Sequence, residues 1–419
     1  MMDTVSGRIS GSLIVAVIVA GLAQTTASVQ TPRPSAPADW PQWRGPARDG
    51  TIASLPAEWP KELTKRWEVS VGAGHSSPVV AGTRVVIIAR QGTREIVRAL
   101  DLASGKQLWQ ADYDAPYTVN PAAASHGPGP KSTPAIAGGR VFTLGIGGVL
   151  SAFDLASGTL RWRTPAPSAL PQYGTGTSPV VEGNLVIAHV GGHNDGAITA
   201  FDAASGTPRW RWTGDGPAYG SPIVASIGGV RQVIAVTQKS FVGLNAADGT
   251  LLWQLPFTTE YNQSAVTAVA RGDQVVFSGL NKPTVALRIR GKGSQWAAEQ
   301  VWSNDQVPMF MSSPVLIGDT LFGLTHMNRG QLFALNWATG KVLWTTQGRE
   351  GENASIAGNQ AWLVVATTDG ELIVGRPAAT GFTAVQRYKI ADSAVWAHPA
   401  YAGRSLIIKD ADKVICWGF

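Results

Sequence analysis

Short apolar segments alternate with glycine-rich turns along most of the chain, and residues 132–162 show this pattern clearly. Three short apolar segments follow one another between residues 135 and 153, separated by glycines. Asp154 then opens a tight turn, because its carboxylate can accept hydrogen bonds from backbone N–H groups about two residues on. Gly158 can adopt the positive φ of the reversal, and Trp162 follows on a fourth segment. The pattern predicts four short antiparallel strands.

The same unit recurs along the chain. Its triplet of Asp or Asn, Gly and Trp, at two intervals of four, returns at Asp101, Gly105 and Trp109, at Asp202, Gly206 and Trp210, at Asn245, Gly249 and Trp253, and at Asn336, Gly340 and Trp344. A Ser-Pro or Thr-Pro pair opens the unit, with its proline at Pro78, Pro134, Pro179, Pro222 and Pro314. Weaker copies begin near residues 265 and 356, and the last begins at Pro399.

The spacing of these units predicts the fold. The eight starts lie 42 to 56 residues apart, close to the roughly 40–50 residues of a four-stranded propeller blade. A helical solenoid is the alternative among repeat folds, but no segment of useful length shows a hydrophobic period of about 3.6 residues. We therefore expect an all-β fold, an eight-bladed β-propeller of four-stranded antiparallel blades.

The two ends of the chain are expected to share one blade. After Pro399 only three strands fit before the chain stops, so one strand is missing from the last unit. Residues 63–71 precede the first complete blade and carry Trp67 in the Trp position. This segment can supply the missing outer strand, and the closure would cover strand edges that otherwise promote aggregation.

The first residues have the pattern of a secretory signal peptide. Arg8 precedes an apolar run at residues 13–23, and Ala23 and Ala27 are candidate cleavage points. Eleven apolar residues are fewer than the roughly 20 that span a membrane, although a single membrane anchor is the alternative. No cysteine lies near the cleavage points, so a lipid anchor is not expected there. We expect a signal peptide over residues 1–27, a Pro-rich linker over 28–39 and a propeller domain over 40–419, located in the periplasm or secreted.

Composition narrows the classes of partner. The chain carries a formal net charge of +6 but no run of Lys or Arg, so a nucleic-acid partner is not expected. The 48 glycines and 16 tryptophans fit many tight turns and repeated aromatic packing. The lone Cys416 cannot form an internal disulfide, and we expect it to be buried in a late strand. We also expect no membrane span in the mature chain, which we predict to be a monomer.

One face of the predicted propeller collects the unusual side chains. Strands of a blade alternate in direction, so the loops before the innermost strand of each blade (inner loops) and those between the second and third strands (middle loops) share a face. The inner loops bring His75, His126, Lys131, Tyr173, Tyr219, Tyr261, Asn262, Met309, Phe310, Glu352, Asn353, Trp396 and His398. The middle loops bring Arg94, His193, Asp195, Lys239, Asn281, Lys282, His326, Arg329 and Asp369.

This clustering of basic and aromatic side chains is typical of a shallow anion-binding mouth. The longest insertion, residues 113–131, lies on the same face, and such loops are often functional. The alternative is a set of ordinary solvated loops. We predict that a protein partner or a small anionic ligand contacts His75, His126, Lys131, Lys239, His326, Arg329 and His398.

No pattern completes a catalytic or metal-binding constellation, and we predict neither. His189 and His193 are four residues apart, but His189 is expected on a strand. A glycosidase-like site would need two opposed carboxylates. The candidates are Glu352, Asp369, Asp195 and Glu260, and the sequence leaves open whether any two of them face each other.

The repeated element Asp-x-x-(Ser/Thr)-Gly-x-x-x-Trp, preceded by an apolar strand and followed by Ser-Pro, resembles the tryptophan-docking repeat of the PQQ-like β-propeller superfamily. The resemblance covers roughly residues 40–419, and the stretch DWPQWRGPARDG at residues 39–50 is similar to the start of secreted bacterial members. In that superfamily the tryptophans lie between neighbouring blades. The resemblance thus implies a structural, blade-docking role for Trp67, Trp109, Trp162, Trp210, Trp253, Trp302 and Trp344.

Two branches of this superfamily imply different functions. Quinoprotein alcohol and sugar dehydrogenases bind PQQ and Ca²⁺ on the propeller axis, and the alcohol dehydrogenases stack the quinone on a disulfide between adjacent cysteines, which a chain with one Cys cannot form. The other branch holds non-enzymatic scaffolds such as the propeller lipoprotein of the outer-membrane barrel assembly machinery. We expect a non-catalytic extracytoplasmic scaffold or binding protein without a cofactor. The alternative is a PQQ-dependent alcohol or sugar dehydrogenase with PQQ and Ca²⁺ in the axial mouth, where Lys131, Lys239 or Arg329 would pair with the PQQ carboxylates.

Overall fold

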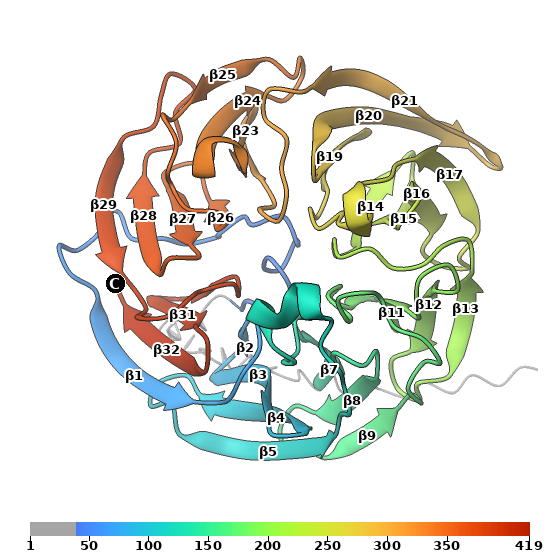
Figure 1. Cartoon of the computed structure of the whole chain (residues 1–419), viewed down its shortest axis with the longest axis vertical. Coiled ribbons are helices and arrows are strands. Elements are labelled where there is room, and N and C mark those ends of the chain that lie inside the picture. Colours follow the sequence, from blue (N-terminus) through green and yellow to red (C-terminus); the bar gives the residue numbers. More distant parts are fainter. Residues whose placement is uncertain (1–38) are drawn as a thin grey trace, which may run out of the picture. The chain divides into compact units, whose positions relative to one another are not determined.

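The structure is a computed structural model that describes residues 39–419. The predicted signal peptide and nearly all of the predicted linker lie outside the described residues. Residues 39–419 form eight four-stranded antiparallel sheets arranged around a central axis (Figure 1). The all-β fold and the eight blades are therefore confirmed.

Seven blades are built from consecutive strands. The first three are β2 (Val79–Ala81), β3 (Arg84–Gln91), β4 (Arg94–Asp101) and β5 (Gln107–Asp114); β6 (Ala135–Ala137), β7 (Arg140–Leu144), β8 (Leu150–Asp154) and β9 (Leu160–Arg163); and β10 (Val180–Glu182), β11 (Leu185–Val190), β12 (Ala197–Asp202) and β13 (Pro208–Trp212). The next two are β14 (Ile223–Ile227), β15 (Val230–Val236), β16 (Ser240–Asn245) and β17 (Leu251–Pro256); and β18 (Val269–Arg271), β19 (Gln274–Gly279), β20 (Lys282–Lys292) and β21 (Gln295–Asn304). The last two are β22 (Val315–Ile317), β23 (Thr320–Thr325), β24 (Gln331–Asn336) and β25 (Val342–Thr345); and β26 (Ala354–Gly358), β27 (Leu363–Thr367), β28 (Glu371–Gly375) and β29 (Ala384–Lys389).

The eighth blade joins the two ends of the described chain, as the sequence predicts. Its strands are β30 (Ala400–Ala402), β31 (Ser405–Lys409), β32 (Lys413–Gly418) and, outermost, β1 (Thr64–Ser70). In the antiparallel ladder between β1 and β32, Trp67 lies opposite Cys416, which is buried. The ring is thus closed by hydrogen bonds between segments nearly 350 residues apart.

Three short 3-10 helices lie in the loops: η1 (Pro121–His126), η2 (Glu260–Asn262) and η3 (Met327–Arg329). Within residues 39–419, no helix is long and apolar enough to cross a membrane.

Burial follows the position of each strand in its blade. The third strand β4 has six consecutive buried residues, whereas the outer strand β5 buries only Trp109 and Tyr113. Apolar side chains on both faces of the inner strands pack against the neighbouring blades, and Trp109 shares a core cluster with Val141 and Phe153 of the next blade. The core is therefore made between blades.

The docking tryptophans contact the turn of the following blade. The indole N–H of Trp67 donates to the carbonyl of Leu102 (2.9 Å), and a Cβ added to Gly105 would lie 2.7 Å from the indole ring. Equivalent bonds join Trp109 to Leu155, Trp162 to Ala203, Trp210 to Ala246, Trp302 to Trp337 and Trp344 to Ala378.

Trp253 departs from this pattern. It packs against Val275 and Phe277 of the following blade, but its indole N–H donates to the Oε1 of Gln232 within its own blade (2.8 Å). The following blade joins β20 and β21 by a long hairpin and lacks the Asp/Asn-Gly turn that offers a carbonyl elsewhere.

The residues that precede β1 cross the propeller axis. Trp40 pairs with Val80 of the first blade, and the backbone N–H of Ile52 donates to the carbonyl of Gly358 in the seventh (2.8 Å). Residues 40–52, which we call the axial segment, form the blue trace that enters the middle of the ring (Figure 1).

Two arginines of the axial segment bind the Ser-Pro pairs that open the blades. Arg44 donates to the carbonyl of Ser313 (2.8 Å), and Arg48 donates to the carbonyls of Pro222 and Pro179 (2.9 Å each). Both side chains are buried, and burial lowers the pKa of Arg44 to about 10 and that of Arg48 to about 9. The sequence predicts that the domain begins here, but it does not predict that this segment fills the centre of the ring.

Candidate ligand site at the propeller axis

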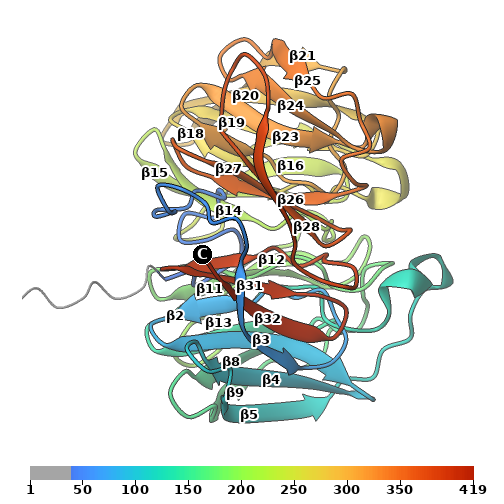
Figure 2. The same ribbon diagram turned by 90° about the vertical axis from the view of Figure 1, so that its left-hand side faces the viewer.

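A cavity of about 220 Å³ opens at the axis, on the face that carries the inner loops. Figure 2 shows this face by the teal loop of η1, opposite the side on which the blue N-terminal segment lies. The lining residues are Trp43, His75, Ala122, Ala123, His126, Lys131, Tyr173, Gly176, Tyr219, Ser221, Gln263, Ala265, Met311, Asn353, Ala354, Ser355, Thr368, Val395, Trp396 and His398. Apart from Trp43 and Thr368, they come from the inner loops and the first positions of the innermost strands, because these lie nearest the axis. We call this cavity the axial pocket.

The axial segment supplies an aromatic wall of the axial pocket. The indole N–H of Trp43 donates to the Oγ1 of Thr267 (2.9 Å), which fixes the ring. The Trp43 ring packs on the buried His398 ring with a centroid separation of 4.2 Å.

A second wall consists of two histidines and a tryptophan. The ring centroid of His126 lies 5.4 Å from that of His75 and 4.8 Å from that of Trp396. The η1 helix places His126: the Oδ1 of Asn120 caps it by accepting from the backbone N–H of Ala122 (2.9 Å). The insertion at residues 113–131 therefore contributes directly to the axial pocket.

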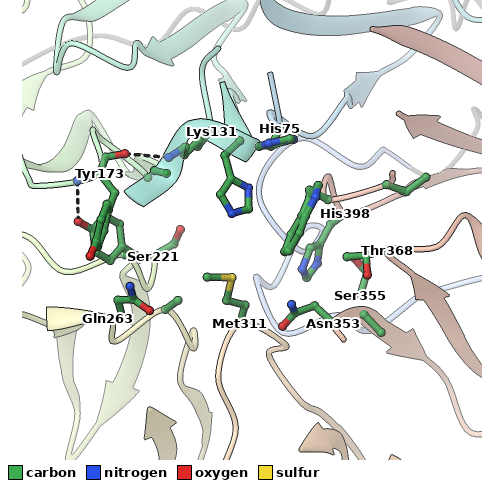
Figure 3. Close-up of a pocket in the computed structure, with 18 of the residues that line it drawn as sticks. His75, Lys131, Tyr173, Ser221, Gln263, Met311, Asn353, Ser355, Thr368 and His398 are labelled. Atoms are coloured by element: carbon green, nitrogen blue, oxygen red, sulfur yellow. Dashed lines mark hydrogen bonds between the residues drawn. The ribbon is translucent and has the colours of Figure 1, made fainter. Parts of the chain in front are cut away.

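Lys131 lies beside His75, and its side chain points toward Tyr173 (Figure 3). The Lys131 Nζ donates to the carbonyl of Tyr173 (2.8 Å), and the Tyr173 backbone N–H donates to the hydroxyl of Tyr219 (3.1 Å). Burial lowers the pKa of Lys131 to about 8 and raises the pKa of the Tyr219 hydroxyl. Lys131 is therefore mostly protonated at neutral pH, and Tyr219 is neutral.

The histidines of the axial pocket are uncharged at neutral pH. Burial lowers the pKa of His75 to about 3, and it also lowers the pKa of His126 and of His398. No Asp or Glu is among the lining residues of the described chain. Lys131 thus carries the charge of the axial pocket, and this charge is positive.

The structure separates the seven predicted site residues into two groups. His75, His126, Lys131 and His398 line the axial pocket, whereas Lys239, His326 and Arg329 do not. Middle loops join the second and third strands, and each strand adds about 4.8 Å of distance from the axis, so their side chains lie farther out. That either group binds a ligand or partner stays a prediction.

Among the middle-loop residues, His326 has the best-defined surroundings. Its Nε2 lies 3.2 Å from the Oδ1 of Asn281, and its ring centroid is 6.2 Å from that of Phe310. Lys239 is held through its backbone N–H, which donates to the buried carboxylate of Asp215 (2.6 Å).

The sequence pattern does not identify Trp43 as a pocket residue, because it lies about 30 residues before the first inner loop. The available signal was the similarity of residues 39–50 to the start of secreted relatives. The four carboxylates weighed for a glycosidase-like site, Glu352, Asp369, Asp195 and Glu260, are absent from the axial pocket lining. Within residues 39–419, no group of three or more His, Cys, Asp or Glu side chains is placed to hold a metal ion.

Comparison with known proteins agrees with the repeat pattern. The sequence model of the family described as outer membrane protein assembly factor BamB matches residues 93–346. An outer membrane protein assembly factor BamB from Yersinia pestis is 22% identical over 368 residues, which cover 84% of this chain and 78% of that protein. The BamB of Shewanella oneidensis is 26% identical over 312 residues, covering 71% of this chain and 65% of that protein.

Solved structures share the fold. The crystal structure of BamB from Moraxella catarrhalis has a TM-score of 0.61 at 16% identity and covers 85% of this chain and 98% of that one. A quinohemoprotein alcohol dehydrogenase from Pseudomonas putida HK5 has a TM-score of 0.59 at 15% identity, with coverage of 91% and 80%. These findings confirm the resemblance to PQQ-like propeller repeats.

Proposed function

Because the chain belongs to the family of the outer membrane protein assembly factor BamB, we propose that it is an extracytoplasmic, non-catalytic propeller that binds a protein partner during the assembly of outer membrane proteins. The observation that carries this proposal is the family match over residues 93–346, which extends from the first blade to the sixth. The two assembly factors that match at 22% and 26% identity support the same role.

The geometry supports a rigid binding platform. The ring is closed by β1 and β32, and the axial segment ties blades together at the centre. Such a body can present its loops to a partner without a change of shape, which limits the entropy lost on binding. We place the partner on the face of the inner and middle loops, where Lys239 and Arg329 add basic side chains that favour an acidic surface.

The dehydrogenase alternative requires a site for Ca²⁺ and PQQ. Ca²⁺ takes six to eight oxygen ligands, usually including carboxylates, and no carboxylate of the described chain lines the axial pocket. The sole cysteine, Cys416, is buried in β32. The lining residues do not fit Ca²⁺, and we derive no quinone chemistry from them.

The role is tested in the native host. Deletion of the gene should lower the amount of folded outer membrane proteins in the envelope, and expression of the intact chain should restore it. The Lys239→Ala, Arg329→Ala double variant should restore it less well, with binding to the isolated partner that depends less on salt because two screened charges are gone. Unchanged outer membrane proteins after deletion would refute the proposed function.

A separate titration tests the alternative. PQQ and Ca²⁺ are added to the purified protein while the quinone absorbance and dye reduction with alcohols and sugars are followed. We expect no stoichiometric quinone binding and no turnover. Turnover with any of these substrates would replace the scaffold role by the dehydrogenase role.

A further inference from the structure

We propose that the axial pocket binds a small organic carboxylate, with Lys131 as its counter-charge and the surrounding aromatic rings as the site for its apolar body. This inference goes beyond the proposed scaffold function, because it concerns a cavity within the propeller and a ligand that the assembly role does not require.

The charge of Lys131 lacks a counter-ion in the described part of the chain. Its Nζ donates to one protein acceptor, the Tyr173 carbonyl, and an ammonium group has three N–H donors. No ion pair among residues 39–419 includes Lys131, and no carboxylate lines the axial pocket. Two N–H groups therefore remain for an anion, at a half-buried position where water screens the charge less than on the surface.

A second lysine, the buried Lys409, also contributes positive charge near the axial pocket. Burial lowers the pKa of Lys409 to about 8, but its Nζ still donates to the carbonyls of Asp410 (2.8 Å) and Ala411 (3.0 Å). The positive charges of Lys131 and Lys409 both lower the pKa of His75. Among the described lining residues an incoming anion would thus meet Lys131 and otherwise neutral side chains, whereas Asp410 and Asp412, which act on Lys409, are not part of that lining.

The apolar body of the ligand would lie between aromatic rings. Trp43, Trp396, Tyr173 and Tyr219 line the axial pocket together with Met311, and the ring centroids of the two tyrosines lie 5.8 Å apart. Flat rings favour a planar group by stacking or edge contacts. The volume of about 220 Å³ lies below the ~300–1,000 Å³ of drug-sized sites, so the ligand is small, of about one ring.

One cation and the neutral polar groups favour a monoanion. Phosphate recognition typically uses several donors converging on one group, such as Arg forks or backbone N–H nests. Lys131 is the one charged side chain among the described lining residues, and four of the neutral polar side chains, Gln263, Asn353, Ser355 and Thr368, lie away from it (Figure 3). A single carboxylate matches this distribution.

Two sources can supply such a group: a free aromatic acid, or the C-terminal carboxylate of a partner that ends in an aromatic residue. The probes are therefore benzoate and a short peptide that ends in phenylalanine with a free carboxylate. Benzamide and the same peptide with an amidated C-terminus are the matched neutral probes. Binding is measured by calorimetry and by the change in total tryptophan fluorescence, to which Trp43 and Trp396 would contribute.

We expect benzoate or the free-carboxylate peptide to bind at least about tenfold more tightly than its amide, and Lys131→Met to lose about tenfold or more in affinity. Lys131→Arg keeps the charge and should retain binding. Lys106→Met, at an exposed lysine of the turn between β4 and β5, should leave the affinity unchanged. Thermal unfolding of each variant shows whether the fold is intact.

Binding of benzoate alone assigns a free acid, and binding of the peptide alone assigns a chain terminus; both support the carboxylate site. Equal affinity for acid and amide, unchanged affinity of a folded Lys131→Met variant, or no binding of either acid at millimolar concentration would overturn it. The proposed scaffold function is tested separately. Unchanged amounts of folded outer membrane proteins after gene deletion would refute that function and would leave the carboxylate site unaffected.

Discussion

The indole N–H of Trp109 donates to the carbonyl of Leu155 at 2.9 Å, and through this bond the outer strand of the first blade is held to the turn of the second. The bond is possible because Gly158, with φ of 74°, leaves room for the ring. A Cβ added to Gly158 would lie 2.5 Å from the Trp109 Cε3. Five turns use this arrangement, so it explains why Gly and Trp recur at a fixed spacing.

Replacing Gly158 by Ala should therefore destabilise the protein through two effects. The positive φ costs roughly 1–2 kcal/mol for a residue with a Cβ, and the clash with the indole adds about 1–3 kcal/mol. Gly183→Ala is the matched control, because Gly183 also has a positive φ of 57° but an added Cβ meets nothing within 4 Å. Chemical denaturation measures both, and equal losses of unfolding free energy would show that the indole contact is unimportant.

Arg44 is expected to contribute more to stability than a surface arginine. Arg44→Met leaves the buried Ser313 carbonyl without its donor and opens the axis, so we expect a loss of at least about 3 kcal/mol. Arg161→Met removes an exposed pair with Asp154 (2.7 Å) and should cost less than about 1 kcal/mol. A similar unfolding midpoint for both variants would contradict a stabilising role for the axial segment.

Buried histidines should make the protein sensitive to mild acid. Burial lowers the pKa of His75 to about 3 and that of His189 to about 4, whereas an unfolded histidine titrates near pH 6.5. Below about pH 6.5 the unfolded chain binds protons that the native protein does not, so the unfolding free energy falls as pH falls, by up to about 1.4 kcal/mol per pH unit for each ring. The loss for His189 levels off below about pH 4, where the native ring is also protonated.

Denaturation curves between pH 7 and pH 5 measure this slope. His189→Asn should reduce the slope of the unfolding free energy against pH by the contribution of one histidine, up to about 1.4 kcal/mol per pH unit. An unfolding free energy that is constant over this range would contradict the burial of neutral histidines.

Carboxylate binding in the axial pocket should weaken at alkaline pH. Since the pKa of Lys131 is about 8, the ammonium group loses its proton above that pH and the anion loses its counter-charge. A surface lysine would stay charged to about pH 10. Benzoate affinity measured from pH 7 to pH 9.5 should fall in the wild-type protein and stay constant in Lys131→Arg. A constant wild-type affinity would place the anion elsewhere.

The blades could be predicted because their signals are local. Asp154, Gly158 and Trp162 belong to one turn and the strand after it, and the eightfold recurrence leaves few arrangements. Strand alternation also predicts which loops share a face, which brought His75 and Lys131 together.

The sequence did not predict how far each loop residue lies from the propeller axis, or which residues fill the centre of the ring. Lys239 and Arg329 share a face with Lys131, but the pattern of strands did not distinguish the rim from the axial pocket. Trp43 contacts Thr267 across 224 residues, and no periodic spacing signals such a contact. The axial segment occurs once and has no regular spacing, so its long-range contacts produce no repeated sequence pattern from which they could be predicted.

The axial segment also bears on the order in which the protein is made. Residues 40–52 and β1 leave the ribosome early, yet Arg48 finds its carbonyl acceptors at residues 179 and 222, Arg44 finds its acceptor at residue 313, and β1 pairs with residues 413–418. Contacts of such high sequence separation form slowly, because the chain must lose the conformational entropy of a long loop before these contacts can form. The earliest part of the domain to be synthesised thus completes its native contacts only after the last blade has been made.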